Sequence, residues 1–282
     1  MAALERPVTA TFPRILELPS GLKLEVSLTP PGPVTELDEE RGVASLPGRR
    51  LAVCLHPWAR LGGNMDDPVL AALLRPLTHY HKFYVLCYNA RGVGLSSGWK
   101  SFTGLQEAED LRELVKCAVK RLNDVREVVL IGYSNGALTA SLHPVLPAPL
   151  LTTHILISYP LGPRGLLTAF RSRTYQRALE DLVQQPGARV LLCQGDADDF
   201  TAAEAYDAWA EALGQLAAGG DDTTGEGDNE EEQETGGEGV GEGWSAERGG
   251  NVLEVVRIPG ASHFWGGQAM RGLIEAVTQF LT

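Results

Sequence analysis

The sequence lacks the features that mark membrane-spanning and secreted proteins. None of its apolar runs approaches the roughly 18 residues that a membrane-spanning helix needs. Its N-terminal residues contain no basic segment followed by an apolar one, which is the pattern of a secretory signal. We therefore expect a cytoplasmic protein that has no membrane partner.

Cysteine is scarce as well. The 282 residues include only four, and they are widely separated: Cys54, Cys87, Cys117 and Cys193. Three of them lie in apolar runs typical of buried strands, where a thiol packs as a small apolar group. Because no CxxC pair or Cys/His cluster is present, the sequence predicts neither a disulfide framework nor a metal site.

Basic residues are outnumbered, with 24 Lys and Arg against 36 Asp and Glu and a formal net charge of −12. Most of this charge lies in residues 219–250, where eleven acids accompany one base, Arg248, and contribute −10. The rest of the chain carries only −2. A nearly neutral body has no basic field for nucleic acid and no polybasic patch for a membrane surface.

The same acidic segment has eleven glycines and a single large apolar side chain, Trp244. Such a composition buries too little apolar surface to offset the entropy lost on ordering. We expect a disordered insertion at residues 219–250 within a single domain that spans residues 1–282. In a parallel sheet this connection should lie at the amino ends of the strands, away from any site at the opposite edge.

Apolar, strand-like runs alternate with amphipathic, helix-like segments along the rest of the chain. The strand-like runs are 14–28 (an antiparallel pair), 49–56, 83–90, 126–133, 153–160, 188–195 and 251–260. The helix-like segments are 65–80, 105–122, 136–143, 202–217 and 270–281. This order predicts an α/β fold with a mostly parallel, doubly wound sheet and helices on both faces. Only 27 residues separate the runs 153–160 and 188–195, which leaves room for one helix or two and for no lid domain.

A serine between two glycines interrupts the transition from strand to helix at G-Y-S-N-G, residues 132–136. In this context the serine occupies a sharp turn that exposes its Oγ above the sheet. Acids and a histidine follow two later strands: Asp196, Asp198, Asp199 and His263. Because ligands of such sheets bind at the carboxyl ends of the strands, these residues are expected to meet.

The motifs together resemble the α/β-hydrolase superfamily, from about residue 49 to residue 282 apart from the acidic segment. The similarity is strongest to small esterases and dienelactone-hydrolase-like members with an HPHPxxGGxMxN loop and an NxRGxGxSxG loop. This chain has HPWARLGGNMDD at 56–67 and NARGVGLSSG at 89–98. Trp58 stands where that subgroup usually has a second histidine.

The resemblance implies a role for each matching residue. Ser134 corresponds to the nucleophile and His263 to the general base, whose imidazole titrates near neutral pH. The family pattern G-x-x-D from Gly195 selects Asp198 as the orienting acid, and Asp196 and Asp199 are expected to cap the following turn or helix. The oxyanion is expected to bind the backbone N–H groups of Asn135 and Trp58.

Four nearby residues have more ordinary expected roles. His56 is expected to shape its loop and Arg91 to anchor one. Phe264 and Trp265 either line the acyl pocket or pack beneath the histidine loop.

The function predicted is that of a serine hydrolase that cleaves a carboxylic ester through an acyl-enzyme, without cofactor or metal. Its partner would be a small-molecule ester or acyl substrate. A peptidase or thioesterase with the same triad is the alternative within this class. A non-catalytic interaction protein on a hydrolase scaffold is the alternative from another class.

Overall fold

A computed structural model describes residues 12–36, 38, 48–219 and 241–282. Its centre is a nine-stranded sheet with the strand order β1-β2-β4-β3-β5-β6-β7-β9-β8. In chain order the strands are β1 (Ile15–Glu17), β2 (Lys23–Thr29), β3 (Arg49–Leu55), β4 (Phe83–Tyr88), β5 (Val125–Tyr133), β6 (Leu151–Ile157), β7 (Arg189–Gly195), β8 (Glu242–Arg248) and β9 (Asn251–Ile258).

Six strands, from β4 to β9 across the sheet, are parallel to one another. Their residues are apolar on both faces because helices cover both, as Val128 to Ile131 of β5 illustrate with no exposed surface. The N-terminal pair β1 and β2 forms one antiparallel edge, as predicted, and β8 forms the other.

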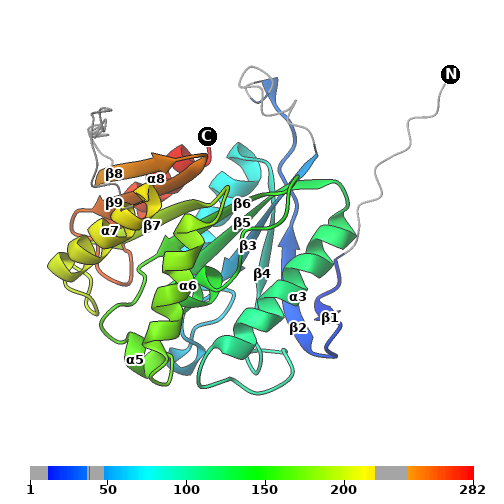
Figure 1. Cartoon of the computed structure of the whole chain (residues 1–282). Coiled ribbons are helices and arrows are strands. Elements are labelled where there is room, and N and C mark those ends of the chain that lie inside the picture. The colour runs from blue at the N-terminus through cyan, green and yellow to red at the C-terminus, as the bar shows by residue number, and fades with distance from the viewer. Residues whose placement is uncertain (1–11, 37, 39–47, 220–240) are drawn as a thin grey trace.

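The helices form a layer on each face of the sheet (Figure 1). One layer holds α3 (Leu105–Leu122), α4 (Asn135–Ser141), α6 (Ser172–Gln184) and α7 (Ala203–Ala218). The other holds α2 (Pro68–Arg75), the π-helical segment η3 (Pro76–Tyr80) and α8 (Gly267–Phe280). The short α5 (Arg164–Leu167) and α6 are the only helices between β6 and β7 in this fully described stretch, so no lid domain is inserted there. No helix among the described residues is long and apolar enough to cross a membrane.

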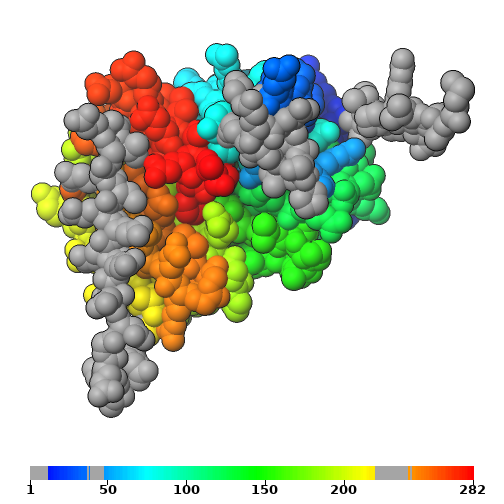
Figure 2. Space-filling view, turned by 90° about the horizontal axis from the view of Figure 1, so that it is seen from above, coloured from blue at the N-terminus to red at the C-terminus, as the bar shows by residue number. Residues whose placement is uncertain are grey.

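The C-terminal end of the chain lies at the amino-end edge of the sheet. Arg50, near the start of β3, donates a hydrogen bond to the carbonyl of Leu281, and Arg189, at the start of β7, donates one to Phe280. Seen from above, this red end of the chain lies between the orange β8–β9 hairpin and blue segments from the N-terminal part (Figure 2). The opposite, carboxyl-end edge of the sheet is therefore left to the loops that follow the strands.

The prediction of disorder throughout 219–250 was wrong for residues 242–248. These residues form β8, which pairs antiparallel with β9 along its whole length. Trp244 packs against α7, where its ring lies so close to Gly214 that a Cβ there would meet it at 2.6 Å. Backbone pairing with an existing strand and this one aromatic contact compensate for a composition that would not fold alone. Residues 220–240 of the predicted insertion lie outside the described residues.

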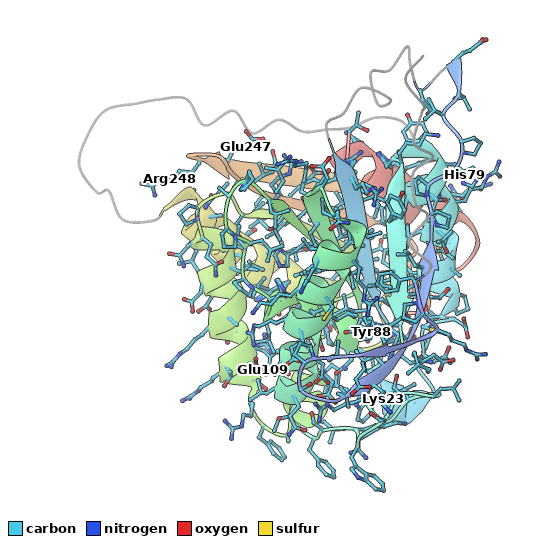
Figure 3. The ribbon with its side chains drawn as sticks, turned by 90° about the vertical axis from the view of Figure 1, so that its right-hand side faces the viewer. Lys23, His79, Tyr88, Glu109, Glu247 and Arg248 are labelled. Carbon is cyan, nitrogen blue, oxygen red and sulfur yellow. The ribbon has the colours of Figure 1, made fainter. Side chains whose placement is uncertain are left out.

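The predicted position of this connection holds for only one of its two ends. Where α7 ends, the side chain of Arg248 donates to the carbonyl of Ala218, and Glu247 and Arg248 lie at the edge opposite Tyr88 (Figure 3). Where β8 begins, however, Glu242 pairs with Arg257 near the carboxyl end of β9. Because β8 runs antiparallel to β9, it has to start at the carboxyl-end edge of the sheet. The sequence did not predict β8, so it did not predict this position either.

Burial of His154 makes the folded chain sensitive to acid. Its side chain has no exposed surface, and burial, together with the neighbouring His143, lowers the pKa of His154 to about 3. An unfolded histidine takes up a proton near pH 6.5. Between that pH and the folded pKa only the unfolded state is protonated, so the free energy of unfolding falls as the pH falls, by about 1.4 kcal/mol per pH unit for this residue.

Between pH 6.5 and pH 5 we expect the free energy of unfolding to fall by about 2 kcal/mol less in His154→Gln than in the unsubstituted chain. Urea unfolding at several pH values measures the difference. His143, whose pKa burial lowers to about 4, acts in the same direction but is present in both proteins. Parallel pH dependences of the two proteins would contradict the expectation, whatever their absolute stabilities.

Candidate functional site

Ser134 occupies the turn between β5 and α4 in a conformation that few residues other than glycine adopt. Its φ is 55° and its ψ −118°, and its backbone N–H is fixed by the carbonyl of Ile157 at 2.8 Å. The two glycines of the motif are needed for steric reasons. A Cβ at Gly132 would overlap the carbonyl oxygen of Gly136, and one at Gly136 would overlap that of Leu55. The turn therefore tolerates a side chain at the serine but not at either glycine.

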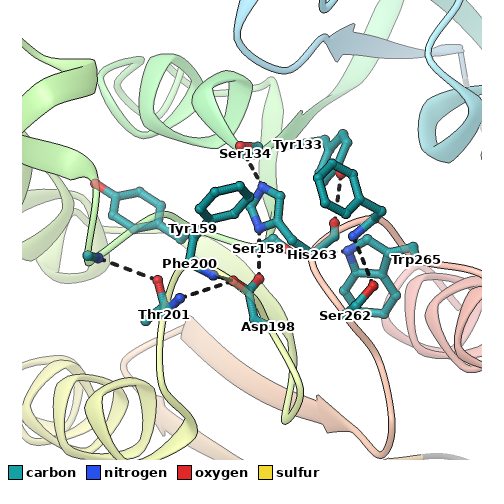
Figure 4. A network of polar contacts seen from close by, with 12 residues as sticks. Tyr133, Ser134, Ser158, Tyr159, Asp198, Phe200, Thr201, Ser262, His263 and Trp265 are labelled. Atoms are coloured by element: carbon teal, nitrogen blue, oxygen red, sulfur yellow. Dashed lines mark hydrogen bonds and ion pairs between the residues drawn. The ribbon is translucent and has the colours of Figure 1, made fainter. Parts of the chain in front are cut away.

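Three of the predicted site residues form a continuous chain of hydrogen bonds (Figure 4). Nε2 of His263 lies 2.9 Å from Oγ of Ser134, and Nδ1 lies 2.8 Å from Oδ2 of Asp198. The side chain of Asp198 is only 1% exposed, and Ser134 and His263 are buried as well. The carboxylate accepts a hydrogen bond from the N–H at Nδ1, so the unprotonated Nε2 is left to accept a proton from the serine.

The loop after β7 determines which of its three acids reaches the histidine. Oδ1 of Asp198 accepts the backbone N–H groups of Phe200 and Thr201, which holds Oδ2 toward His263. Asp196 instead accepts the N–H of Gly260 at 2.6 Å and closes the turn after β9. Asp199 is exposed to solvent. Only Asp198 of the three lies within hydrogen-bond distance of the imidazole.

The position of His263 depends on two residues that the sequence alone did not single out. The hydroxyl of Tyr133 donates to the carbonyl of His263 at 2.7 Å, and burial raises the pKa of Tyr133, so this donor stays protonated. The ring of Phe200 meets the imidazole edge-on, with centroids 4.6 Å apart. Tyr133 precedes the serine of the motif, and Phe200 follows the acid by two residues. Proximity to the motif was the only sequence signal for either.

Of the two places predicted for Phe264 and Trp265, the structure gives one of them to Trp265 and neither to Phe264. Trp265 is 3% exposed and donates its indole N–H to Oγ of Ser158, so it packs beneath the histidine loop. Phe264 is 68% exposed. Neither residue lines the cavity described next.

Trp58 and Asn135, the predicted oxyanion donors, line the same small cavity, of about 50 Å³. The close contact of Gly136 with the end of β3 brings the loop after β3 against the start of α4. In the part of the chain that the structure describes, neither backbone N–H donates a hydrogen bond. Residue 57 is a proline without an N–H, so Trp58 is the first donor that the loop offers after His56.

His56 shapes this loop, as predicted. Its Nδ1 lies 2.7 Å from the carbonyl of Pro57, and its Nε2 accepts the N–H of Ala90 at 3.1 Å. Burial lowers the pKa of His56, which keeps the imidazole neutral and able to donate at one nitrogen and accept at the other. The residue therefore ties the loop after β3 to the loop after β4.

The two family-like loops are joined by a buried polar network that sequence reasoning missed. Asn89 accepts the N–H of Met65 from the first loop and donates to the carboxylate of Glu25 on β2. Glu25 also accepts the N–H of Leu95, and this bond is the largest cause of its lowered pKa. A Cβ at Gly94 would overlap both Asn89 and Glu25, which explains the glycine.

Arg91 anchors its loop as predicted, through two hydrogen bonds of 2.7 and 2.6 Å to the carboxylate of Asp110 on α3. The loop at residues 89–98 is thus held both by Glu25 on β2 and by Asp110 on α3.

Among the described residues, no group of three or more His, Cys, Asp or Glu side chains is placed to hold a metal ion. The cysteines Cys54, Cys87 and Cys193 are buried in strands and unpaired, as their apolar context predicted.

The alpha/beta hydrolase family model matches residues 52–276, which include the serine turn, the acid and the histidine. The chain belongs to this family. The match covers well over half of the sequence and includes most of β3, all of β4 to β9 and most of α8. No curated protein matches the chain.

Several solved structures share the fold of this hydrolase. An alpha/beta serine hydrolase without a lid from Xanthomonas campestris is 23% identical, with a TM-score of 0.63, and the similarity covers 94% of this chain and 91% of that one. A serine hydrolase homologue from Coxiella burnetii is 20% identical, with a TM-score of 0.62 and coverage of 95% and 96%. Est1E from Butyrivibrio proteoclasticus, solved with ferulic acid bound, is 17% identical, with a TM-score of 0.60 and coverage of 92% and 94%.

Proposed function

We propose that this hydrolase cleaves carboxylic esters through an acyl-enzyme formed on Ser134. The observation that carries the proposal is the chain of hydrogen bonds from Ser134 through His263 to Asp198, at 2.9 and 2.8 Å. In the first step Oγ of Ser134 attacks the ester carbonyl while its proton passes to Nε2 of His263. Asp198 holds the imidazole in the tautomer that accepts this proton and stabilises the imidazolium that results.

The charge that develops on the carbonyl oxygen would be bound by the N–H groups of Asn135 and Trp58. Both residues line the cavity beside the serine turn, and neither N–H is used elsewhere in the described chain. The histidine then returns its proton to the leaving alkoxide. In the second step His263 takes a proton from a water molecule, which attacks the carbonyl of the acyl-enzyme. The proton then passes to Oγ of Ser134, and the acid and the free serine are released. This route uses no metal or cofactor.

Two features support an ester with a small acyl or alcohol part. The cavity beside the oxyanion donors has a volume of only about 50 Å³. The connection between β6 and β7 contains only α5 and α6 and provides no lid to enclose a long chain. Among the solved structures of the same fold, Est1E was crystallised with the small aromatic acid ferulic acid.

A panel of p-nitrophenyl esters of increasing acyl length, together with a matched anilide and thioester, tests this proposal. We expect turnover of the esters, with the highest kcat/KM at short acyl length and slow cleavage of the anilide. Faster cleavage of the thioester or the anilide than of every ester would assign the chain to the thioesterases or peptidases. Failure to hydrolyse any substrate, together with no labelling by a fluorophosphonate, would overturn the proposal in favour of a non-catalytic role.

A further inference from the structure

Exposed apolar side chains gather at the edge of the sheet that carries the site. The described part of the chain exposes twelve large apolar side chains, and eight of them lie in the connections that follow β3, β4, β6, β7 and β9. Because these strands are parallel, all five connections leave the same edge and surround Ser134. The eight are Leu61, Leu95, Trp99, Phe102, Leu166, Phe170, Phe200 and Phe264. Single exposed apolar residues are common, but such a gathering marks a binding surface.

These side chains project outward and do not lie flat on the protein. Phe170 is 89% exposed, Trp99 88% and Leu61 75%. A side chain that contacts so little of its own protein is buried most readily by a medium that surrounds it. Lipid in the interfacial region of a bilayer does so, whereas a folded protein would need a separate, matching pocket for each projecting side chain.

Cations accompany the apolar tips on the loops after β3, β4 and β6. Arg60 precedes Leu61, and its guanidinium lies over the ring of Phe102, 4.4 Å from the centroid. Lys100 follows Trp99, is half-buried, and donates a hydrogen bond to the carbonyl of Ala59 at 3.1 Å. Within the described residues neither cation forms an ion pair with a carboxylate. Aromatic rings beside cations that have no carboxylate partner are typical of segments that insert between lipid headgroups while the cations reach the phosphates.

The third connection repeats this arrangement, since Arg171 and Arg173 follow Phe170 closely, are exposed, and have no carboxylate partner among the described residues. The exposed acids in the loops of the same edge are Asp66, after β3, and Asp196 and Asp199, after β7, where Asp196 accepts the N–H of Gly260. The loops after β4 and β6 contain cations and no acid.

We infer that the carboxyl-end edge docks onto a phospholipid bilayer, with the tips at Leu61, Trp99, Phe102 and Phe170 in the headgroup region. The flanking cations favour acidic lipids, and the serine turn then faces the membrane. This inference departs from the absence of a membrane partner that the sequence predicts. The sequence did not predict this surface because its cations and apolar tips come from three separate connections, and the net charge of the body outside residues 219–250 is nearly neutral.

Flotation with lipid vesicles tests the inference on the full chain carrying Ser134→Ala, which prevents hydrolysis of the lipids. We expect binding to phosphatidylcholine vesicles and tighter binding when phosphatidylglycerol is included, with the gain lost at high salt. The pair Trp99→Ser and Phe170→Asn should weaken partitioning at least about tenfold, since each removes an aromatic side chain from the lipid. Asparagine suits position 170 because its φ is 64°.

A matched control pair removes exposed apolar side chains from the other edge: Val34→Ser, after the antiparallel β2, and Leu151→Ser, at the start of β6. We expect this pair to bind vesicles within about twofold of the parent, since neither side chain would meet lipid. Arg60→Gln with Arg171→Gln should abolish the preference for phosphatidylglycerol and leave binding to phosphatidylcholine.

Three results would overturn the inference: no flotation of the parent chain, equal losses in the aromatic pair and the control pair, or unchanged binding in the aromatic pair. Thermal melting checks that each variant is folded. Vesicle binding by the Ser134→Ala chain needs no catalysis, so its outcome is independent of whether the proposed esterase activity exists. Turnover of a soluble ester by the aromatic pair with Ser134 intact should match that of the unsubstituted chain, because only docking is altered.

Discussion

Replacing Ser134 with alanine is expected to lower kcat for a p-nitrophenyl ester by about 10⁴-fold or more. The substitution removes the only atom of the turn that lies within hydrogen-bond distance of Nε2 of His263, at 2.9 Å. Ground-state binding of the ester should change little, because the proposed oxyanion donors are backbone groups. The melting temperature should also stay close to that of the unsubstituted chain, since alanine and serine meet the same strain at a φ of 55°.

A fluorophosphonate probe provides a second readout of the same assignment. It should label the unsubstituted chain at Ser134 and fail to label the alanine variant. Ser262→Ala is the matched control: this serine lies one residue from His263, and its Oγ accepts only the N–H of Phe264 at 3.3 Å. Labelling of any other serine, or full activity of the Ser134 variant, would show that the nucleophile is elsewhere.

Asp198→Asn is expected to lower kcat by about 10⁴-fold, far more than Asp196→Asn or Asp199→Asn. An amide nitrogen facing Nδ1 of His263 favours the wrong imidazole tautomer, and the charge that stabilises the imidazolium is lost. The two control substitutions have little to disturb. Asn at 196 still offers an oxygen to the N–H of Gly260, and the side chain at 199 is exposed.

Steady-state kinetics of the three variants with one ester measure this order directly. The melting temperatures separate loss of catalysis from loss of structure, because Asp198 also accepts the N–H groups of Phe200 and Thr201. A loss at Asp196 equal to or larger than that at Asp198 would contradict the geometry of the loop after β7.

Much of the fold and of the candidate site was predictable because it depends on local patterns. Apolar strands that alternate with amphipathic helices allow few arrangements other than a covered parallel sheet. Such a sheet brings the ends of β5, β7 and β9 to one edge, so Ser134, Asp198 and His263 are brought together by strand order alone. The glycines on either side of Ser134 indicated the turn because only glycine fits the space that α4 and β3 leave there.

The parts that could not be predicted depend on contacts between distant segments. Residues 242–248 became a strand because β9 offered an unpaired edge and Gly214 left space for Trp244. No window of the sequence contains both partners. The network of Glu25 and Asn89, which fixes the loops beside the site, likewise joins residues 64 positions apart.

The sequence by itself determined the order of the elements and the serine turn, because each follows from spacing along a single strand or loop. The choice of Asp198 among three acids was implied by the resemblance to a family pattern. The tertiary structure alone decided which surfaces face outward together. Leu61, Trp99 and Phe170 are ordinary loop residues in the sequence, separated by 38 and 71 positions. Their place after parallel strands predicts that they share an edge, but not that they project from it together. Whether a loop side chain packs inward, as Trp265 does, or outward, as Trp99 does, depends on contacts with distant segments.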